Sequence, residues 1–163
     1  ILDEGRLTDS QGRTVSFKNC IIIMTSNLGS DIILQAPALD DRVKKQIEGM
    51  LRTTFRPEFL NRIDDIIFFK KLSLEDVQQI AIIQLGHLEQ RIAHQHIKLS
   101  IADDVVKELA QRGYSSEFGA RPLKRTIAHD LISPLARYIL QNPLVKNIHV
   151  FLYNTAITFK DVQ

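Results

Sequence analysis

The sequence predicts a mixed fold, with an α/β part up to about residue 70 followed by a helical α+β part closed by roughly three strands. The run CIIIMTSN has the length and branched residues of a central strand in a parallel sheet. Amphipathic helical periodicity dominates after residue 73. The alternating segments IKLSI, NIHVFLY and AITFKDV are typical of a small sheet near the C-terminus.

Composition places the 163-residue chain among ordinary globular proteins. It is 44% hydrophobic and 25% charged, with a formal net charge of +2. No block of like charges indicates a nucleic-acid surface, and no apolar stretch approaches the roughly 20 residues of a membrane-spanning helix. The single cysteine, Cys20, is expected to be a buried thiol, which favours a cytoplasmic protein. Because the chain opens on Ile1 rather than Met, we expect it to be part of a longer protein.

The first part of the chain is predicted to alternate between strands and a helix. Two glycines around a polar centre indicate a hairpin or a looped excursion over residues 5–17. After the CIIIMTSN strand, apolar residues recur every fourth position over 40–55, which predicts a helix capped by Asp40 or Asp41 and ended by Pro57. The run DIIFFKKL, residues 65–72, is a second candidate strand.

The second part is predicted to be mainly helical. Ser73 and Asp76 have the spacing of a capping box, although Asp replaces the usual Glu or Gln, and begin a long helix that ends near AHQH. A strand over 97–101 and a helix over 102–112 follow. A long helix begins near Arg121 and should kink at Pro134. The last two strands meet at Asn154 and Thr155.

Asn27 follows the first predicted strand directly. An amide at the C-terminal end of a parallel strand can hold a water or a phosphate oxygen, because it offers both a donor and an acceptor. Asn after a strand is also a common turn former, and position alone favours that interpretation.

Two arginines occur in FRPEFLNRID. Arg62 lies in a loop ahead of two acidic residues, and pairing with Asp64 or Asp65 is the commonest fate of such a side chain. Phosphate recognition is the alternative, since the guanidinium fork is always charged. Arg56 precedes a proline, which favours an extended backbone and a local structural role.

Arg121, in FGARPLKR, is expected at a helix N-terminus, where the macrodipole opposes a positive charge by up to about 1 kcal/mol. Either a bound anion or pairing with Glu117 would compensate. The five histidines lack the spacing of metal ligands, so we expect no metal site. The sequence also contains no glycine-rich phosphate loop and no nucleophile motif.

Four blocks in register, GRLTDSQGRTVSFKN, IIIMTSNLGS, FRPEFLNRID and GYSSEFGARPLKR, strongly resemble the second ATPase module of Clp-family AAA+ chaperones, most closely the ClpB type. The resemblance covers nearly the whole chain. It implies that residues 1–70 are the C-terminal part of the large nucleotide-binding subdomain. It implies that residues 71–163 are the small C-terminal subdomain.

The resemblance also implies roles for the three polar residues. Asn27 matches sensor 1, which orients the attacking water. Arg62 matches the arginine finger, which reaches the ATP of the neighbouring subunit in a hexameric ring. Arg121 matches sensor 2, which contacts the phosphates of its own subunit. All three tasks are electrostatic stabilisation of phosphoryl transfer.

The family's phosphate loop and magnesium-binding acidic pair (Walker A and Walker B) would lie upstream of ILDEG. We therefore expect ATP or ADP with Mg²⁺ in the longer protein, and neither a held cofactor nor ATPase activity in this chain alone. Expected partners are identical subunits in a homo-hexamer, misfolded or aggregated polypeptides, and a co-chaperone system.

Protease-partnered relatives carry a hydrophobic-Gly-hydrophobic loop, whereas this chain has only Gly49 on a predicted helix. Disaggregation is thus favoured over docking to a protease ring. A protease-linked unfoldase and a non-enzymatic adaptor module are the alternatives.

Overall fold

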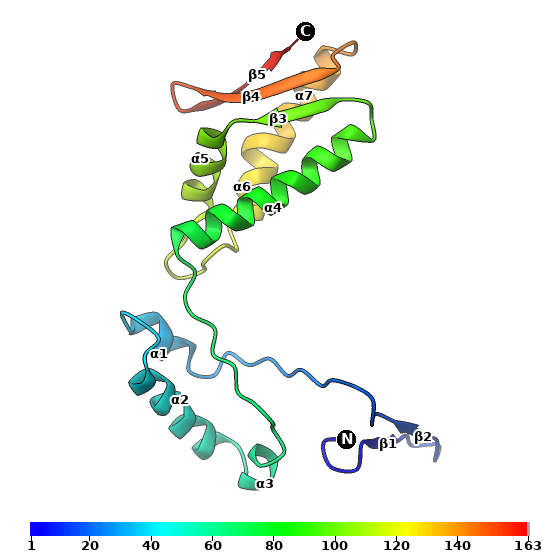
Figure 1. Ribbon diagram of the computed structural model, residues 1–163, viewed down its shortest axis with the longest axis vertical. Helices are drawn as coiled ribbons and strands as arrows, with labels where there is room; N and C mark the ends of the chain where they lie inside the picture. Colours follow the sequence, from blue (N-terminus) through cyan, green and yellow to red (C-terminus); the bar gives the residue numbers. More distant parts are fainter. Residues whose placement is uncertain (163) are drawn as a thin grey trace. The chain divides into compact units, whose positions relative to one another are not determined.

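The computed structural model describes residues 1–162. The chain divides into two compact units, the first Ile1–Lys70 and the second beginning at Lys71 (Figure 1). Each unit is described by itself. The fold is mixed, as the sequence predicts, with helices in both units and a three-stranded sheet in the second. None of the described helices is long and apolar enough to cross a membrane.

The first unit begins with a small hairpin. Strands β1 (Arg6–Thr8) and β2 (Thr14–Ser16) pair antiparallel, which confirms the hairpin predicted for this stretch. Helix α1 (Ser30–Gln35) and helix α2 (Asp41–Thr54) follow. Asp40 caps α2 by accepting a hydrogen bond from the Val43 backbone N–H at 2.9 Å. The short helix α3 (Pro57–Leu60) ends the unit's regular structure, with proline in its first turn.

The two strands predicted for this unit are not formed. Residues 20–26 and 65–72 carry no strand assignment, and Ile21 and Ile23 are 91% and 83% exposed. In Figure 1 the segment after β2 runs without a neighbouring strand. A strand needs partners for its backbone N–H and C=O groups, and no segment of residues 1–162 provides them here. For the same reason the prediction of a buried Cys20 is wrong, because its side chain is exposed.

The second unit has a complete hydrophobic core. Helix α4 (Leu74–Ala93) begins with the predicted capping box, in which Ser73 and Asp76 exchange hydrogen bonds at 3.1 and 2.9 Å. Strand β3 (Lys98–Ile101) and helix α5 (Asp103–Gly113) follow, close to the predicted bounds. The core joins α4, α5, the C-terminal helices and the sheet; its fully buried members are Val77, Ala81, Val105, Leu109, Ala110, Leu131 and Val150.

The long C-terminal helix is divided into three segments. Helix α6 (Leu123–Thr126) passes into a π-helical segment, η1 (Ile127–Ile132), and then into α7 (Ser133–Gln141). The change to π geometry comes just before Pro134, which has no N–H to donate to the preceding turn. The Ser133 hydroxyl donates to the Ala128 carbonyl at 2.9 Å. The sequence predicted a kink at Pro134; the structure has a π-helical segment just before it.

The sheet has the order β3, β4, β5. Strand β4 (Asn147–Tyr153) is central, parallel to β3 and antiparallel to β5 (Ala156–Asp161). The turn between β4 and β5 places Asn154 and Thr155 at positive φ, as a tight hairpin requires. Figure 1 shows the three strands lying together against the helices of this unit. The small closing sheet predicted from the alternating segments is confirmed.

Candidate functional site

Asn27 lies in a turn that leads into α1. Its backbone carbonyl accepts hydrogen bonds from the Ser30 N–H at 3.1 Å and from the Ser30 hydroxyl at 2.7 Å. Its side chain is exposed and makes no hydrogen bond within residues 1–162. The backbone of Asn27 therefore forms the turn, while its amide remains available to a ligand.

Gly29 fixes this turn against α2. It is buried with a φ of 78°, in the left-handed region that glycine adopts most easily. A Cβ atom at this position would lie 2.8 Å from Cγ2 of Ile47, a buried residue of α2. The close approach requires glycine, and it places the turn of Asn27 on the surface of α2.

Arg62 follows α3 and forms an ion pair with a residue far away in the sequence. Its Nη2 donates to Oδ2 of Asp3 at 2.9 Å, and the two side chains are 46% and 69% exposed. The local partners considered from the sequence, Asp64 and Asp65, form no ion pair with it in the part of the chain that the structure describes. Sequence spacing could not indicate Asp3, which is 59 residues away.

Arg56 contributes through its backbone. It has the extended conformation predicted for a residue before proline, with φ −66° and ψ 144°. Its carbonyl accepts hydrogen bonds from the N–H groups of Phe59 and Leu60 at 3.0 and 3.2 Å. Arg56 is therefore the N-cap residue of α3. Arg62 follows the C-terminal end of the same helix, and its side chain is partly exposed.

Arg121 lies in the turn just before α6, which begins at Leu123, two residues later than the start near Arg121 that the sequence predicted. The loop that carries it, residues 114–122, is closed by two backbone hydrogen bonds between Ser115 and Gly119, at 3.0 and 2.8 Å. The side chain of Arg121 is exposed and has no ion pair within the described chain. Glu117, the alternative partner, forms no ion pair with it in the described chain; the Glu117 N–H donates to the Ser115 hydroxyl at 3.3 Å.

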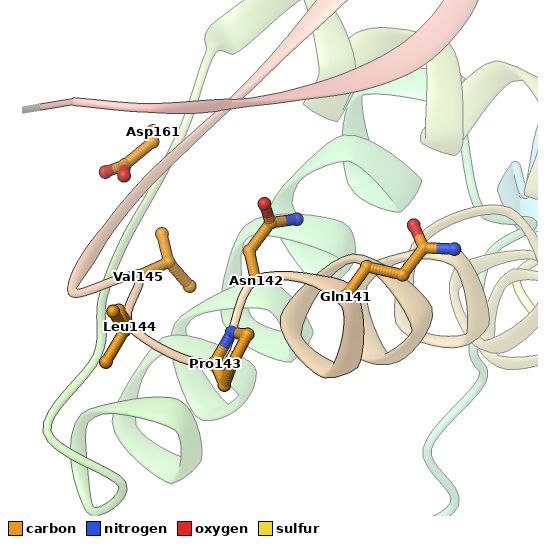
Figure 2. A pocket seen from close by; sticks show the side chains of 6 residues that line it. All are labelled: Gln141, Asn142, Pro143, Leu144, Val145 and Asp161. Atoms are coloured by element: carbon orange, nitrogen blue, oxygen red, sulfur yellow. The ribbon is translucent and has the colours of Figure 1, made fainter.

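Hollows open on the surface of the second unit, and two of them are lined by described residues as follows. The first lies at the end of α7, where Leu144, Val145 and Asp161 are among its lining residues (Figure 2). Its only charged lining residue is an aspartate, so it offers no cation to a phosphate. The second is lined by Arg112, Pro122, Arg125, Thr126, His129 and Asp130. It therefore lies beside the turn that carries Arg121.

Arg112 at the end of α5 was not singled out by the sequence, yet it contacts three elements. Its Nε donates to Glu108 at 2.7 Å, its Nη1 to Asp130 at 3.3 Å and its Nη2 to the Thr155 carbonyl at 2.7 Å. The hydrogen bond to Glu108 raises the pKa of Arg112 above its ordinary value. Only the i,i+4 spacing to Glu108 was visible in the sequence.

Asp130 joins Arg112 to a histidine. His129 Nδ1 lies 2.7 Å from one carboxylate oxygen of Asp130, and Arg112 contacts the other. The hydrogen bond with His129, followed by that with Arg112, lowers the pKa of Asp130, while partial burial acts in the opposite direction. Among residues 1–162, no group of three or more His, Cys, Asp or Glu side chains could hold a metal ion.

Comparison with known proteins places both units in one family. Residues 72–152 match the model of the C-terminal D2-small domain of ClpB protein. Residues 1–66 match the AAA domain (Cdc48 subfamily) model. The chain is 47% identical over 148 residues to chaperone protein ClpB 1 of Synechocystis, an alignment that covers 89% of this chain. The chain belongs to the ClpB family of AAA+ chaperones.

A second ClpB relative and two solved Hsp104 structures are also similar to this chain. The chain is 44% identical over 155 residues to chaperone protein ClpB of Meiothermus ruber, covering 93% of this chain. Among solved structures, the S. cerevisiae Hsp104-ADP complex matches 96% of this chain and 29% of its own, with a TM-score of 0.83 and 37% identity. The S. cerevisiae Hsp104:casein complex matches 97% and 29%, with a TM-score of 0.80 and 37% identity. The chain spans 16% and 18% of the length of the two ClpB relatives.

Proposed function

We propose that this chain is part of an ATP-dependent protein disaggregase, which threads misfolded polypeptide through a homo-hexameric ring in the cytoplasm. Residues 1–70 would be the C-terminal part of its large nucleotide-binding subdomain and residues 71–163 its small subdomain. Membership of the ClpB family carries the proposal. The Hsp104 structures, in complexes with ADP and with casein, support nucleotide and polypeptide as ligands of the whole protein.

The three polar residues fit contacts with the phosphates of ATP or ADP and Mg²⁺. Asn27 has a free amide, and Arg121 has a guanidinium with no ion pair in the described chain. Arg62 is held by one exposed ion pair, which a phosphate could replace at small cost. Planar, permanently charged donors suit a phosphoryl group as negative charge shifts during transfer. We assign Asn27 to sensor 1, Arg62 to the arginine finger and Arg121 to sensor 2.

The two alternative functions receive less support. A protease-linked unfoldase would need an exposed docking loop, but Gly49 lies inside helix α2. A non-enzymatic adaptor would not need the first unit, which matches an AAA domain model. The proposal therefore keeps ATP hydrolysis in the longer protein, with a co-chaperone system as partner. The chain alone is proposed to hydrolyse no ATP, because the phosphate loop and acidic pair would be supplied from upstream.

The decisive experiment is complementation between two inactive variants of the full-length protein, with its other ATPase module inactivated. Arg62→Ala and Asn27→Ala should each hydrolyse ATP at least about a hundredfold more slowly than the parent. Mixed rings should regain activity, because an Arg62→Ala subunit keeps Asn27 and receives Arg62 from its neighbour. If the mixture is no more active than its components, the finger does not act in trans.

Two controls separate this role from a local structural one. Arg56→Ala removes an exposed arginine from the same short stretch and should leave turnover unchanged. Asp3→Asn removes the observed partner of Arg62 and should also leave turnover unchanged. A loss in Asp3→Asn equal to that in Arg62→Ala would show that the ion pair, rather than a phosphate contact, explains the effect.

A further inference from the structure

Arg112 lies in the last turn of helix α5, just before the loop that carries Arg121, and links α5 to η1 and to the β4–β5 turn. Its three donor nitrogens contact Glu108 in its own helix, Asp130 in η1 and the Thr155 carbonyl in the β4–β5 turn. Two of these contacts leave α5, and they join segments 18 and 43 residues away. Such a fork fixes direction as well as distance, because the guanidinium is planar.

The loop is narrow at its base. Gly113 ends α5, and a Cβ atom there would lie 2.7 Å from both Cα and Cδ1 of Leu123. The end of α5 and the start of α6 are thus in direct contact. Arg112 directly precedes Gly113 on one side of this contact. Arg121 lies two residues before Leu123 on the other side. A change in the angle between α5 and the helix that begins with α6 would therefore move Arg121.

The loop itself is closed by its own hydrogen bonds. Ser115 and Gly119 are paired through their backbones, and the Arg121 N–H donates to the Phe118 carbonyl at 3.2 Å. A loop with this internal closure moves as one piece with its base. The base of the loop consists of the end of α5 and the start of α6. The hydrogen bonds of Arg112 to Asp130 and to the Thr155 carbonyl connect this base to η1 and to the β4–β5 turn.

We propose that Arg112 is a positioning residue for Arg121, and that its contacts with Asp130 and Thr155 set where the Arg121 guanidinium meets the nucleotide. This inference rests on the proposed role of Arg121 as sensor 2. Three of the five N–H groups of Arg112 are engaged within the second unit, by Glu108, Asp130 and the Thr155 carbonyl. We assign Arg112 an effect on ATP through the placement of Arg121 and no phosphate contact of its own.

The test measures ATP affinity in the full-length protein for three variants. Arg112→Gln and Asp130→Asn both remove the link between α5 and η1, and each should raise the Kd for ATP about tenfold. Glu108→Gln is the matched control, because it removes an ion pair of the same guanidinium inside α5 and leaves both inter-element contacts. It should bind ATP like the parent. Arg112→Lys keeps the charge but loses the fork and should fall between.

A double variant separates positioning from general stability. If Arg112 acts through Arg121, then Arg112→Gln should have no further effect on the Kd for ATP in an Arg121→Ala background. Additive effects in the two backgrounds would overturn the inference. Equal affinities for Asp130→Asn and Glu108→Gln would overturn it as well, and this comparison remains informative even if Arg112→Gln does not fold. If Arg121→Ala alone leaves ATP binding unchanged, the sensor 2 assignment fails instead.

Discussion

Gly113→Ala is expected to destabilise the second unit, although alanine is normally the better helix former. The added Cβ would lie 2.7 Å from the Leu123 Cα, which is about 0.7 Å closer than ordinary van der Waals contact at 3.4 Å. A backbone atom cannot rotate away, so α5 and α6 must separate. Overpacking of this kind costs about 1–3 kcal/mol. The gain in helix propensity is at most about 1 kcal/mol, and less at a helix terminus.

Gly86→Ala provides the matched control. Gly86 lies in the interior of α4, and a Cβ atom there would meet no other atom within 4 Å. The same substitution should therefore stabilise the unit by about 0.5–1 kcal/mol. The overpacking cost at Gly113 and the gain at Gly86 together separate the two variants by about 1.5–4 kcal/mol in the free energy of unfolding, less the small propensity gain at Gly113, with opposite signs relative to the parent.

Tyrosine fluorescence during urea denaturation is the suitable assay. The chain has three tyrosines and no tryptophan, and Tyr114, Tyr138 and Tyr153 all lie in the second unit. The signal therefore reports on that unit even if the first unfolds separately. A denaturation midpoint for Gly113→Ala equal to or above that of Gly86→Ala would refute the close contact between Gly113 and Leu123.

Two further predictions concern the same unit. Ser73→Ala should cost about 1 kcal/mol of unfolding free energy, because the Asp76 N–H at the start of α4 loses its side-chain acceptor; Ser116→Ala, an exposed control, should change the urea midpoint little. Asp130 has a lowered pKa in the folded chain, so its stabilising effect is present above its ordinary carboxyl pKa and is lost as pH falls through the folded value. The parent should lose stability over that acidic range, while Asp130→Asn should lose less, as measured by urea midpoints at a series of pH values.

The second unit could be predicted closely from its sequence because its signals are local and complete. The Ser73 and Asp76 pair specifies the start of α4, and the alternation in residues 147–161 specifies two strands joined at Asn154. All the strands of this sheet are present in the chain. Local pattern and tertiary packing therefore favour the same structure.

The first unit shows the limit of the same reasoning. The run from Cys20 to Met24 has strong strand propensity, but propensity alone does not satisfy backbone hydrogen bonds. Without partner strands in residues 1–162 it remains extended and exposed. The helix α2 was predictable nevertheless, because its hydrogen bonds are internal and its cap, Asp40, is adjacent in sequence.

The candidate site was also predictable only in part. Residue chemistry singled out Asn27, Arg62 and Arg121, but it could not find Arg112, whose inter-element partners are 18 and 43 residues distant. Contacts of that separation depend on how α5, η1 and the β4–β5 turn pack. They become visible only once the core that joins these elements has been described.

The ion pair between Arg62 and Asp3 bears on the proposed finger in a specific way. Both side chains are exposed, so the pair contributes about 1 kcal/mol or less after solvent screening and the ordering of two side chains. A phosphate with several negative oxygens offers the guanidinium a stronger, bidentate contact. If Arg62 acts in trans as proposed, exchange from Asp3 to a nucleotide phosphate would cost about 1 kcal/mol or less, so the pair is compatible with that role.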